Sequence, residues 1–321
     1  MTSHAQVIII GGGPAGYTAA LYAARAGLSP ICFEGFDTGG QISRSEQVDN
    51  YPGLHGVTGV DLGVKIREQA ETFGARFEFG DVFEVDFGAT PFKITGMNGE
   101  VTADSVIVAT GAAARKLGLP SEAALEGRGI AYCAICDGPM FAGKDVIVVG
   151  GGDAAVGEAL ALRHIAGKVT LVHRRAEFRA SGVMRAALDA ATDVSVITSA
   201  VVEEILGVET GNVTGVRLRM VDDDSERVLD AEGVFVSIGH EPASEMFQPW
   251  VTVDDYGFIV TEAGTTATNV PGVFAAGDVA DARYRQVITA AASGCQAAID
   301  AERYLAAEQL MPPRELQSAK G

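Results

Sequence analysis

Two glycine-rich segments, each placed between an apolar run and an alanine-rich run, constrain the fold of this chain more than any other feature. The first is residues 11–16 (GGGPAG) after the apolar run 7–10, and the second is residues 150–155 (GGGDAA) after the apolar run 146–149. This order of strand, glycine turn and helix is the fingerprint of a dinucleotide-binding unit, because the glycines let a pyrophosphate approach the helix N-terminus. The chain has 40 glycines, so one such turn is weak evidence. Two turns in matched context predict two dinucleotide sites.

The residues expected to face the ribose rings differ between the two segments. Twenty-three residues after the first glycine of the first segment stands Glu34, whereas the same place in the second is held by His173, followed by Arg174 and Arg175, with Arg179 further on. An acid accepts hydrogen bonds from a free 2′-hydroxyl and repels a 2′-phosphate, while arginines attract the phosphate. The first site therefore suits FAD or NAD and the second NADP, and a pair of different dinucleotides implies that electrons pass between them.

Apolar strands alternate with helical runs through both halves, which is typical of α/β domains with parallel sheets. We expect helices over residues 17–26 and 153–166, each stopped by a glycine. The apolar run 273–278 resembles the first module more than the second, so the second module is predicted to be inserted in the first. The fold class is thus α/β with two Rossmann-like domains: a discontinuous FAD-binding domain of residues 1–115 and 246–321, and an NADPH-binding domain of residues 116–245 that carries a cysteine pair.

That pair, Cys133 and Cys136, is separated by two residues and followed at once by Asp137. This spacing lets two sulfurs close a small disulfide ring, and beside two electron-carrying sites it predicts a redox dithiol. Half of a zinc site is the alternative, but four ligands are normally needed and no second cysteine pair exists. Asp137 is a candidate to exchange protons with the thiols. We expect Cys32 and Cys295 to be buried and inert.

Composition narrows the functional class. The 321 residues are 47% hydrophobic with a formal charge of −18, so general binding to nucleic acid is disfavoured. The first residues lack the pattern of a signal peptide, and no apolar run approaches the ~18 residues of a membrane span. We therefore expect a cytoplasmic protein that binds no nucleic acid or membrane and needs no metal. A frayed tail is expected around Pro312 and Pro313.

Taken together, these motifs resemble the low-molecular-weight, bacterial-type thioredoxin reductases, and the resemblance runs from Val7 to about Leu305. Besides the two glycine segments and the cysteine pair, the segments that match are Gly39-Gly40-Gln41, Asn50-Tyr-Pro-Gly53, Ala109-Thr-Gly111, His173-Arg-Arg-x-x-x-Arg179, Ile238-Gly-His-x-Pro242, Gly277-Asp278 and Arg285-Gln286.

The resemblance implies a set of binding residues. The FAD contacts it implies are Gly11, Gly12, Gly13, Pro14, Ala15, Gly16, Glu34, Gly39, Gly40, Gln41, Asn50, Val82, Asp278, Arg285, Gln286 and Val287. The NADPH contacts are Gly152, Asp153, Ala154, His173, Arg174, Arg175, Arg179 and Ile238.

The resemblance also implies a homodimer and a path for electrons, from NADPH through FAD to the Cys133–Cys136 disulfide and on to thioredoxin. Cys136 is expected to face the flavin and Cys133 to attack the partner disulfide. One flavin face cannot hold nicotinamide and disulfide together, so the inserted domain is expected to rotate, with hinges near residues 112–119 and 238–245. Rival hypotheses are a dithiol oxidase, a ferredoxin–NADP reductase, a reductase of another small redox protein and a non-catalytic redox sensor.

Three positions bear on the partner. Arg44 lies in a segment, Ser43 to Glu46, where the family usually has threonines, and Pro139 and Met140 replace the residues usual after Asp-Gly. Arg128, five residues before the first cysteine of the pair, is a candidate for steering an acidic or polar partner.

Overall fold

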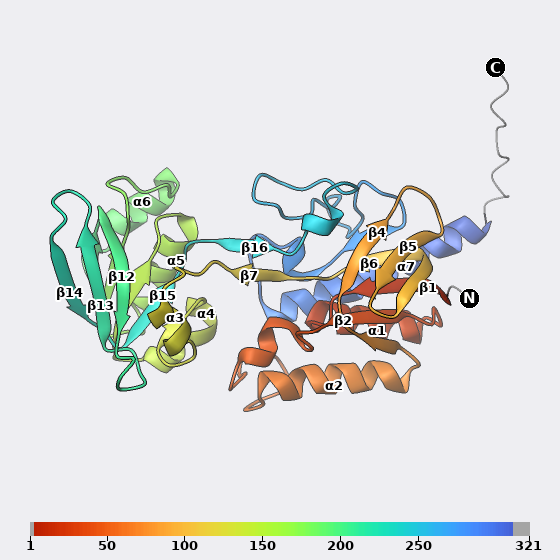
Figure 1. The fold of residues 1–321 in the computed structure, drawn as a ribbon, viewed down its shortest axis with the longest axis horizontal. Helices are drawn as coiled ribbons and strands as arrows, with labels where there is room; N and C mark the ends of the chain where they lie inside the picture. Colours follow the sequence, from red (N-terminus) through yellow and green to blue (C-terminus); the bar gives the residue numbers. More distant parts are fainter. Residues whose placement is uncertain (1–2, 311–321) are drawn as a thin grey trace, which may run out of the picture. The chain divides into compact units, whose positions relative to one another are not determined.

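The structure, a computed structural model, describes residues 3–310, so the predicted frayed tail lies outside the described residues. The chain divides into two compact units (Figure 1). Unit 1 consists of Met1–Ala113 and Glu241–Gly321, and unit 2 of Ala114–His240. The two segments that connect the units pair with each other as a two-stranded ribbon of β7 (Ala112–Ala114) and β16 (His240–Pro242). The ribbon lies within both predicted hinge segments.

Unit 1 is built on a seven-stranded sheet in the order β3-β2-β1-β6-β5-β4, with β17 also paired to β6. The parallel strands β1, β2, β3, β6 and β17 form one part, and β4 and β5 join β6 as an antiparallel meander. The strand bounds are β1 Ser3–Ile10, β2 Ile31–Gly35, β3 Arg76–Phe79, β4 Val82–Asp86, β5 Phe92–Gly96, β6 Gly99–Val108 and β17 Val273–Ala275.

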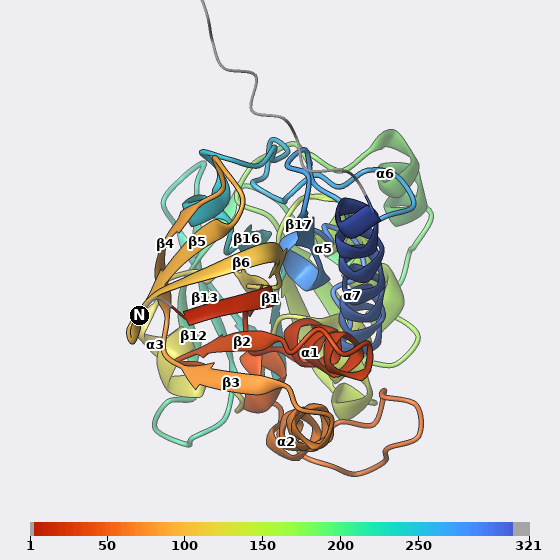
Figure 2. The same ribbon diagram turned by 90° about the vertical axis from the view of Figure 1, so that its right-hand side faces the viewer.

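Side chains alternate between the two faces of this sheet, as the period of a strand requires. Val7 and Ile9 pack with the helices α1 (Pro14–Arg25), α2 (Gly59–Thr72) and α7 (Val287–Leu310). Figure 2 shows these three helices on one side of the sheet. Ile8 and Ile10 point to the opposite face and pack with the meander and with residues 247–259. The strongly apolar β1 is therefore buried on both faces.

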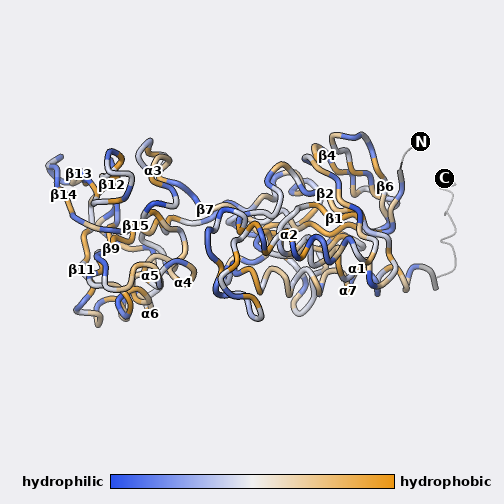
Figure 3. Tube along the Cα trace, turned by 90° about the horizontal axis from the view of Figure 1, so that it is seen from below, coloured by the Kyte–Doolittle hydropathy of each residue, from blue (hydrophilic) through white to orange (hydrophobic). Residues whose placement is uncertain are grey.

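Unit 2 is a three-layer structure. Its parallel sheet has the order β11-β10-β9-β15-β8, and helices α5 and α6 cover one face. An antiparallel sheet, β12-β13-β14, packs over the other face. Figure 3 shows hydrophobic residues concentrated along the sheet strands such as β9. The bounds are α3 Pro120–Leu125, β8 Ile130–Ala131, α4 Ala134–Asp137, β9 Asp145–Val149, α5 Asp153–Leu162, β10 Lys168–Val172, α6 Gly182–Asp189, β11 Val194–Ile197, β12 Ala200–Leu206, β13 Gly215–Met220, β14 Glu226–Asp230 and β15 Gly233–Val236.

Both predicted fingerprint helices exist, with shifted ends. Helix α1 begins three residues earlier than predicted, at Pro14, because proline suits the first helical turn. It gives way to Gly27, whose φ of +78° suits the left-handed conformation after a helix. Helix α5 ends at Leu162, four residues before the predicted end, and the chain continues in turns that bond back to the Leu162 carbonyl. No helix among residues 3–310 is long and apolar enough to span a membrane.

The packing of α7 on α1 generates a prediction. A Cβ atom at Gly294 would lie 2.1 Å from the carbonyl oxygen of Ala15, so Gly294→Ala should push the helices apart and cost about 1–3 kcal/mol of unfolding free energy. The matched control is Gly157→Ala in α5, where the nearest atom would be the flexible end of Met184 at 3.5 Å, and there we expect no loss. Thermal or urea denaturation measures both. Equal effects of the two variants would contradict the packing argument.

Candidate functional site

The first fingerprint turn packs tightly on one side and is open on the other. A Cβ atom at Gly12 would lie 2.6 Å from the carbonyl oxygen of Glu34, and one at Gly16 would lie 1.8 Å from that of Gly11. At Gly13, by contrast, the nearest atom would be 3.9 Å away, in Gly40. The turn therefore presses against its own strands while leaving Gly13 accessible to a ligand.

The second turn repeats this arrangement in unit 2. A Cβ atom at Gly150 would lie 2.2 Å from the Ser237 carbonyl oxygen, and one at Gly151 would lie 2.1 Å from the His173 ring. At Gly152 no atom would lie within 4 Å. In both units, then, the third glycine of the turn is the one that faces open space.

Each open glycine also begins a helix that has no side-chain cap. Gly13 has φ −96° and ψ −174°, and Gly152 has φ −99° and ψ −178°, so the two helix starts have the same backbone geometry. The first N–H groups of a helix have no partners within it, and together with the helix dipole they attract an anion. A dinucleotide pyrophosphate fits both places, because the approach is open and amide donors are present.

Beside the second turn, three arginines carry unpaired positive charge. Arg174, Arg175 and Arg179 are exposed, and none forms an ion pair within residues 3–310. Arg179 is fixed near the turn, since its amide donates to the Gly151 carbonyl at 2.8 Å. The cluster therefore has the charge and the position that a ribose 2′-phosphate needs.

His173 lies beneath the turn rather than among these cations. It is 5% exposed, stacks on Phe178 with ring centroids 5.1 Å apart, and bonds through Nε2 to the Glu177 carbonyl oxygen at 3.1 Å. Burial is the main reason that the pKa of His173 is lowered, with a further contribution from the neighbouring arginines. The neutral ring therefore supports Gly151 from below.

The other predicted NADPH residues surround the start of α5. Ala154 is exposed, and the carboxylate of Asp153 accepts a hydrogen bond from the Ser181 amide at 2.5 Å. Ile238 packs against the core between the two sheets of unit 2.

The predicted FAD residues all belong to unit 1 and come from several of its segments. Gly39 and Gly40 form a left-handed turn, with φ of +87° and +68°, that packs on Gly13 and Pro14. The other residues of the set are Ala15, buried in α1, the exposed Gln41 and Asn50, Val82 at the start of β4, Asp278 in a short turn after β17, and Arg285, Gln286 and Val287 at the start of α7.

Glu34 is the last residue but one of β2 and is held by two residues that the sequence did not single out. Its carboxylate accepts from the Tyr17 hydroxyl at 2.6 Å and from Nε of Arg67 at 2.8 Å. The Tyr17 hydroxyl in turn accepts from the Gly39 amide at 3.1 Å. Burial and the bond to Glu34 raise the pKa of Tyr17, and the same carboxylate raises the pKa of Arg67.

In unit 2, Cys133 and Cys136 form a disulfide whose Cα atoms are 5.3 Å apart. Cys133 precedes α4 and its sulfur accepts from the Cys136 amide at 3.1 Å, while Cys136 is exposed. Burial raises the pKa of the adjacent Asp137 carboxyl. A disulfide at the surface with an acid beside it can exchange electrons and protons with a partner.

The residue before the disulfide is anchored by a buried acid. The Tyr132 hydroxyl donates to Glu122 at 3.2 Å, and the same carboxylate accepts from the Gly118 amide at 2.9 Å. Glu122 is 1% exposed, and burial raises the pKa of Tyr132. This contact fixes the backbone that leads into the disulfide.

The other two cysteines differ from each other. Cys32 is fully buried, as predicted, and burial raises the pKa of its thiol. Cys295, predicted to be buried, is partly exposed on α7, because that helix has a surface-facing side at this position. Within residues 3–310, no cluster of three or more histidine, cysteine or acidic side chains is placed to hold a metal ion.

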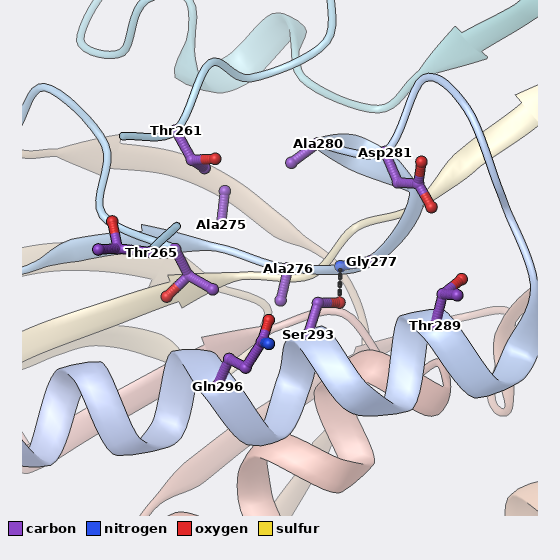
Figure 4. Close-up of a pocket in the computed structure, with 11 residues that line it drawn as sticks. Thr261, Thr265, Ala275, Ala276, Gly277, Ala280, Asp281, Thr289, Ser293 and Gln296 are labelled. Atoms are coloured by element: carbon purple, nitrogen blue, oxygen red, sulfur yellow. Dashed lines mark hydrogen bonds between the residues drawn. The ribbon is translucent and has the colours of Figure 1, made fainter. Parts of the chain in front are cut away.

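Unit 1 also has a pocket of about 240 Å³ between α7, β17 and the loop around Thr265 (Figure 4). Ser293 accepts from the Gly277 amide at 2.8 Å and donates to a carbonyl of its own helix. Thr289 and Thr265 also donate to backbone carbonyls. Because these hydroxyls are already satisfied, we assign no ligand to the pocket.

Comparison with known proteins decides the family. The family model described as pyridine nucleotide-disulphide oxidoreductase matches residues 5–294. The chain is a member of the thioredoxin reductase family of these oxidoreductases. It is 47% identical over 310 residues to a thioredoxin reductase of Coxiella burnetii, with 94% of this chain and 97% of that protein covered. The structure of a thioredoxin reductase from Giardia duodenalis matches with a TM-score of 0.90 and 40% identity, over 95% of this chain and 100% of that one.

One similar protein carries a different name. A glucosaminate ammonia-lyase of Pseudomonas fluorescens is 48% identical over 310 residues, with 94% of this chain and 96% of that protein covered.

The predicted family resemblance and the α/β fold class are confirmed. As a member of this family the chain is an NADPH-dependent flavoprotein oxidoreductase that uses FAD and NADPH.

Asp278, a predicted FAD contact, should make the unfolding free energy of the protein depend on pH. Burial, with repulsion from Asp281, raises the pKa of Asp278 to about 6. A carboxyl raised on folding favours the folded state below its unfolded pKa, and that contribution is lost as the pH rises through the folded value. Relative to Asp278→Asn, the wild type should therefore lose up to about 2 kcal/mol of unfolding free energy between about pH 4 and 6. Urea denaturation across this range tests it, and parallel curves for the two proteins would contradict it.

Proposed function

We propose that this protein is a thioredoxin-disulfide reductase that takes electrons from NADPH and delivers them through the Cys133–Cys136 disulfide. The observation that carries the proposal is that unit 2 combines the disulfide with an open fingerprint turn and an unpaired arginine cluster. A ferredoxin–NADP reductase would not need the cysteine pair, and a dithiol oxidase would not need the arginines.

The proposed binding roles follow the two turns. Unit 1 would hold FAD, with its pyrophosphate at Gly13 and the start of α1, and Asp278 and residues 285–287 as further contacts. Unit 2 would hold NADPH at Gly152, with its 2′-phosphate on the arginine cluster. Bound FAD would supply the two-electron transfer between nicotinamide and disulfide.

The proposed exchange involves the two cysteines of this chain and the disulfide of its partner. Two electrons open the Cys133–Cys136 bond. The Cys133 thiolate then attacks one sulfur of the partner disulfide and forms a mixed disulfide, and the other partner sulfur leaves as a thiolate. Cys136 then attacks the Cys133 sulfur, which restores the disulfide of this chain and releases the second partner sulfur as a thiolate. The two partner thiolates take up protons from solvent and become the dithiol.

Asp137 is proposed to hold the proton that this exchange moves. Because burial raises its pKa, its carboxyl keeps a proton at higher pH than an exposed aspartate does. It can give that proton to a thiolate of the opened pair and take it back when the ring closes.

The surface around the disulfide suits an apolar partner face. Ile135, between the two cysteines, is 72% exposed, and Met140 is 66% exposed. We propose that these side chains contact thioredoxin or a related small redox protein. Arg128, which is exposed, stays a candidate for electrostatic steering. Arg44 instead pairs with Asp37 at 2.7 Å on the surface of unit 1.

A homodimer in the cytoplasm and rotation of unit 2 between half-reactions also belong to the proposal, on the strength of the family resemblance.

NADPH oxidation by the purified protein, followed with each host thioredoxin in turn, tests the function. Steady oxidation that depends on thioredoxin supports it, and oxidation driven only by oxygen would favour the oxidase. Ammonia release from glucosaminate without thioredoxin-dependent NADPH oxidation would overturn the proposal.

The first prediction concerns the cysteine pair. Cys133→Ser and Cys136→Ser should each abolish thioredoxin reduction, because neither single thiol can complete the exchange. NADPH should still bleach the flavin absorbance of both variants under anaerobic conditions, because that step does not use the disulfide. The control is Cys295→Ser, a partly exposed thiol on α7 of unit 1 that takes no part in the proposed exchange. Near-normal thioredoxin turnover in either variant of the pair would show that it is structural.

The second prediction concerns coenzyme choice. Replacing Arg174 and Arg175 with glutamine should raise the KM for NADPH at least about tenfold, because charge-assisted bonds to phosphate are worth about 1.5–3 kcal/mol each. The KM for NADH should change little. Arg185→Gln, on helix α6 of the same unit, is the matched control. A wild type that uses NADH as efficiently as NADPH would refute this role of the cluster.

A further inference from the structure

The buried carboxylate of Glu34 has its hydrogen bonds within unit 1. The Glu34 side chain is only 4% exposed. Its Oε1 accepts from the Tyr17 hydroxyl at 2.6 Å and from Arg67 Nε at 2.8 Å, and its Oε2 accepts from Arg67 Nη2 at 3.2 Å. A ligand hydroxyl would therefore have to reach the one acceptor position left on Oε2, in a carboxylate that an ion pair and a tyrosine already enclose.

Arg67 is itself fixed on several sides. Its Nη1 donates to Glu71, one turn further along α2, at 2.6 Å. Its guanidinium lies over the ring of Phe77 in β3, 4.5 Å from the centroid, and that ring packs edge-on against Tyr17. The Glu34 carboxylate thus joins α1, α2, β2 and β3, and moving it toward a ligand would break contacts in each.

The Tyr17 hydroxyl links the Glu34 carboxylate to the turn at Gly39 by two hydrogen bonds. It donates to Glu34 and accepts from the Gly39 amide at 3.1 Å. Gly39 also lies close to α2, since a Cβ atom at Gly63 would be 3.4 Å from its Cα, and the adjoining Gly40 packs on Gly13. The position of the Gly39–Gly40 turn relative to the fingerprint turn therefore depends on the Tyr17 hydroxyl and on the carboxylate behind it.

Unit 2 has the same arrangement with a different residue. His173 follows β10 in unit 2 at the place that Glu34 has in unit 1, near the end of the strand after the fingerprint helix. Counted over the whole residue, His173 is 5% exposed and Glu34 is 6% exposed. In each unit the second glycine of the turn would collide with this residue if it carried a Cβ, at 2.1 Å for Gly151 and 2.6 Å for Gly12. The contact at Gly151 is with the His173 ring, whereas the contact at Gly12 is with the Glu34 main chain, so what the two positions share is close packing beneath the turn.

We propose that Glu34 is a positioning residue, which acts through Tyr17 on the Gly39–Gly40 turn, and that it does not hydrogen-bond the adenosine ribose. This inference rests on the proposed binding of FAD to unit 1. The role of Glu34 is then to hold the Gly39–Gly40 turn, which is itself a predicted FAD contact, and not to recognise the sugar.

The first test is the rate at which FAD leaves the holoprotein in dilute urea, read as the rise in flavin fluorescence. Tyr17→Phe removes only the hydroxyl that links Glu34 to Gly39, so it should release FAD about tenfold faster, as expected for loss of a hydrogen bond to a charged group. Glu34→Gln should act in the same direction, and the double variant should be no faster than the faster single one. Tyr22→Phe, on the same helix, is the control and should match the wild type.

The second test separates positioning from ribose recognition. Holoprotein is incubated with FAD and its 2′-deoxyadenosine analogue, both in excess over the protein and at the same concentration. The bound flavins are then compared by mass spectrometry. If Glu34 only positions the turn, the wild type should bind FAD and the analogue in a ratio within about twofold of one. The missing 2′-hydroxyl then leaves no buried acceptor unpaired. A wild type that prefers FAD at least tenfold, a preference lost in Glu34→Gln, would overturn the inference, as would FAD release unchanged in Tyr17→Phe. Folded protein that contains no flavin and cannot be loaded with FAD would instead refute the proposed function.

Discussion

The structure depends on the close contact between each glycine turn and the end of the neighbouring strand. At these contacts the backbone of the turn lies directly on Glu34 in unit 1 and on His173 in unit 2, with no room for a methyl group. Because the inner side of the turn is packed, its outer side is left to the third glycine, where the helix begins with free amides. Packing on one side and anion binding on the other are therefore two results of one backbone shape.

The charged residues around the turn differ between the two units. In unit 1 the surroundings of the turn are held by an ion pair between the buried Glu34 and the partly exposed Arg67, and in unit 2 the residues after the turn are surface arginines without an ion-pair partner in the described part of the chain. A buried ion pair fixes a loop, since breaking it leaves an unpaired charge, whereas exposed arginines are free to meet a phosphate. We expect this difference to suit unit 1 to FAD and unit 2 to the 2′-phosphate of NADPH. The disulfide lies in the second of these.

Local patterns in the sequence predicted most of this arrangement. The two fingerprints, the cysteine pair and the alternation of strands and helices are each readable within about 30 residues, so the family and the fold class followed from them. The contacts of Glu34 did not, because Arg67 lies 33 residues away on α2 and nothing in its own neighbourhood marks it as a partner. Glu122 beneath Tyr132 was also missed, because nothing in the sequence marks this nearby glutamate as buried. The end of α5 at Leu162 was missed because no glycine or proline stands between Leu162 and Gly167, although the backbone already turns after Leu162.

The most direct test of the account is to map the thiols that NADPH creates. The full-length holoprotein is treated anaerobically with one equivalent of NADPH, alkylated and digested, and the labelled cysteines are identified by mass spectrometry. The account predicts new labelling of Cys133 and Cys136 alone, with Cys32 unlabelled before and after, and loss of the new labels when oxidised thioredoxin is added first. Unchanged labelling of Cys133 and Cys136 after NADPH treatment of flavin-loaded protein would contradict it.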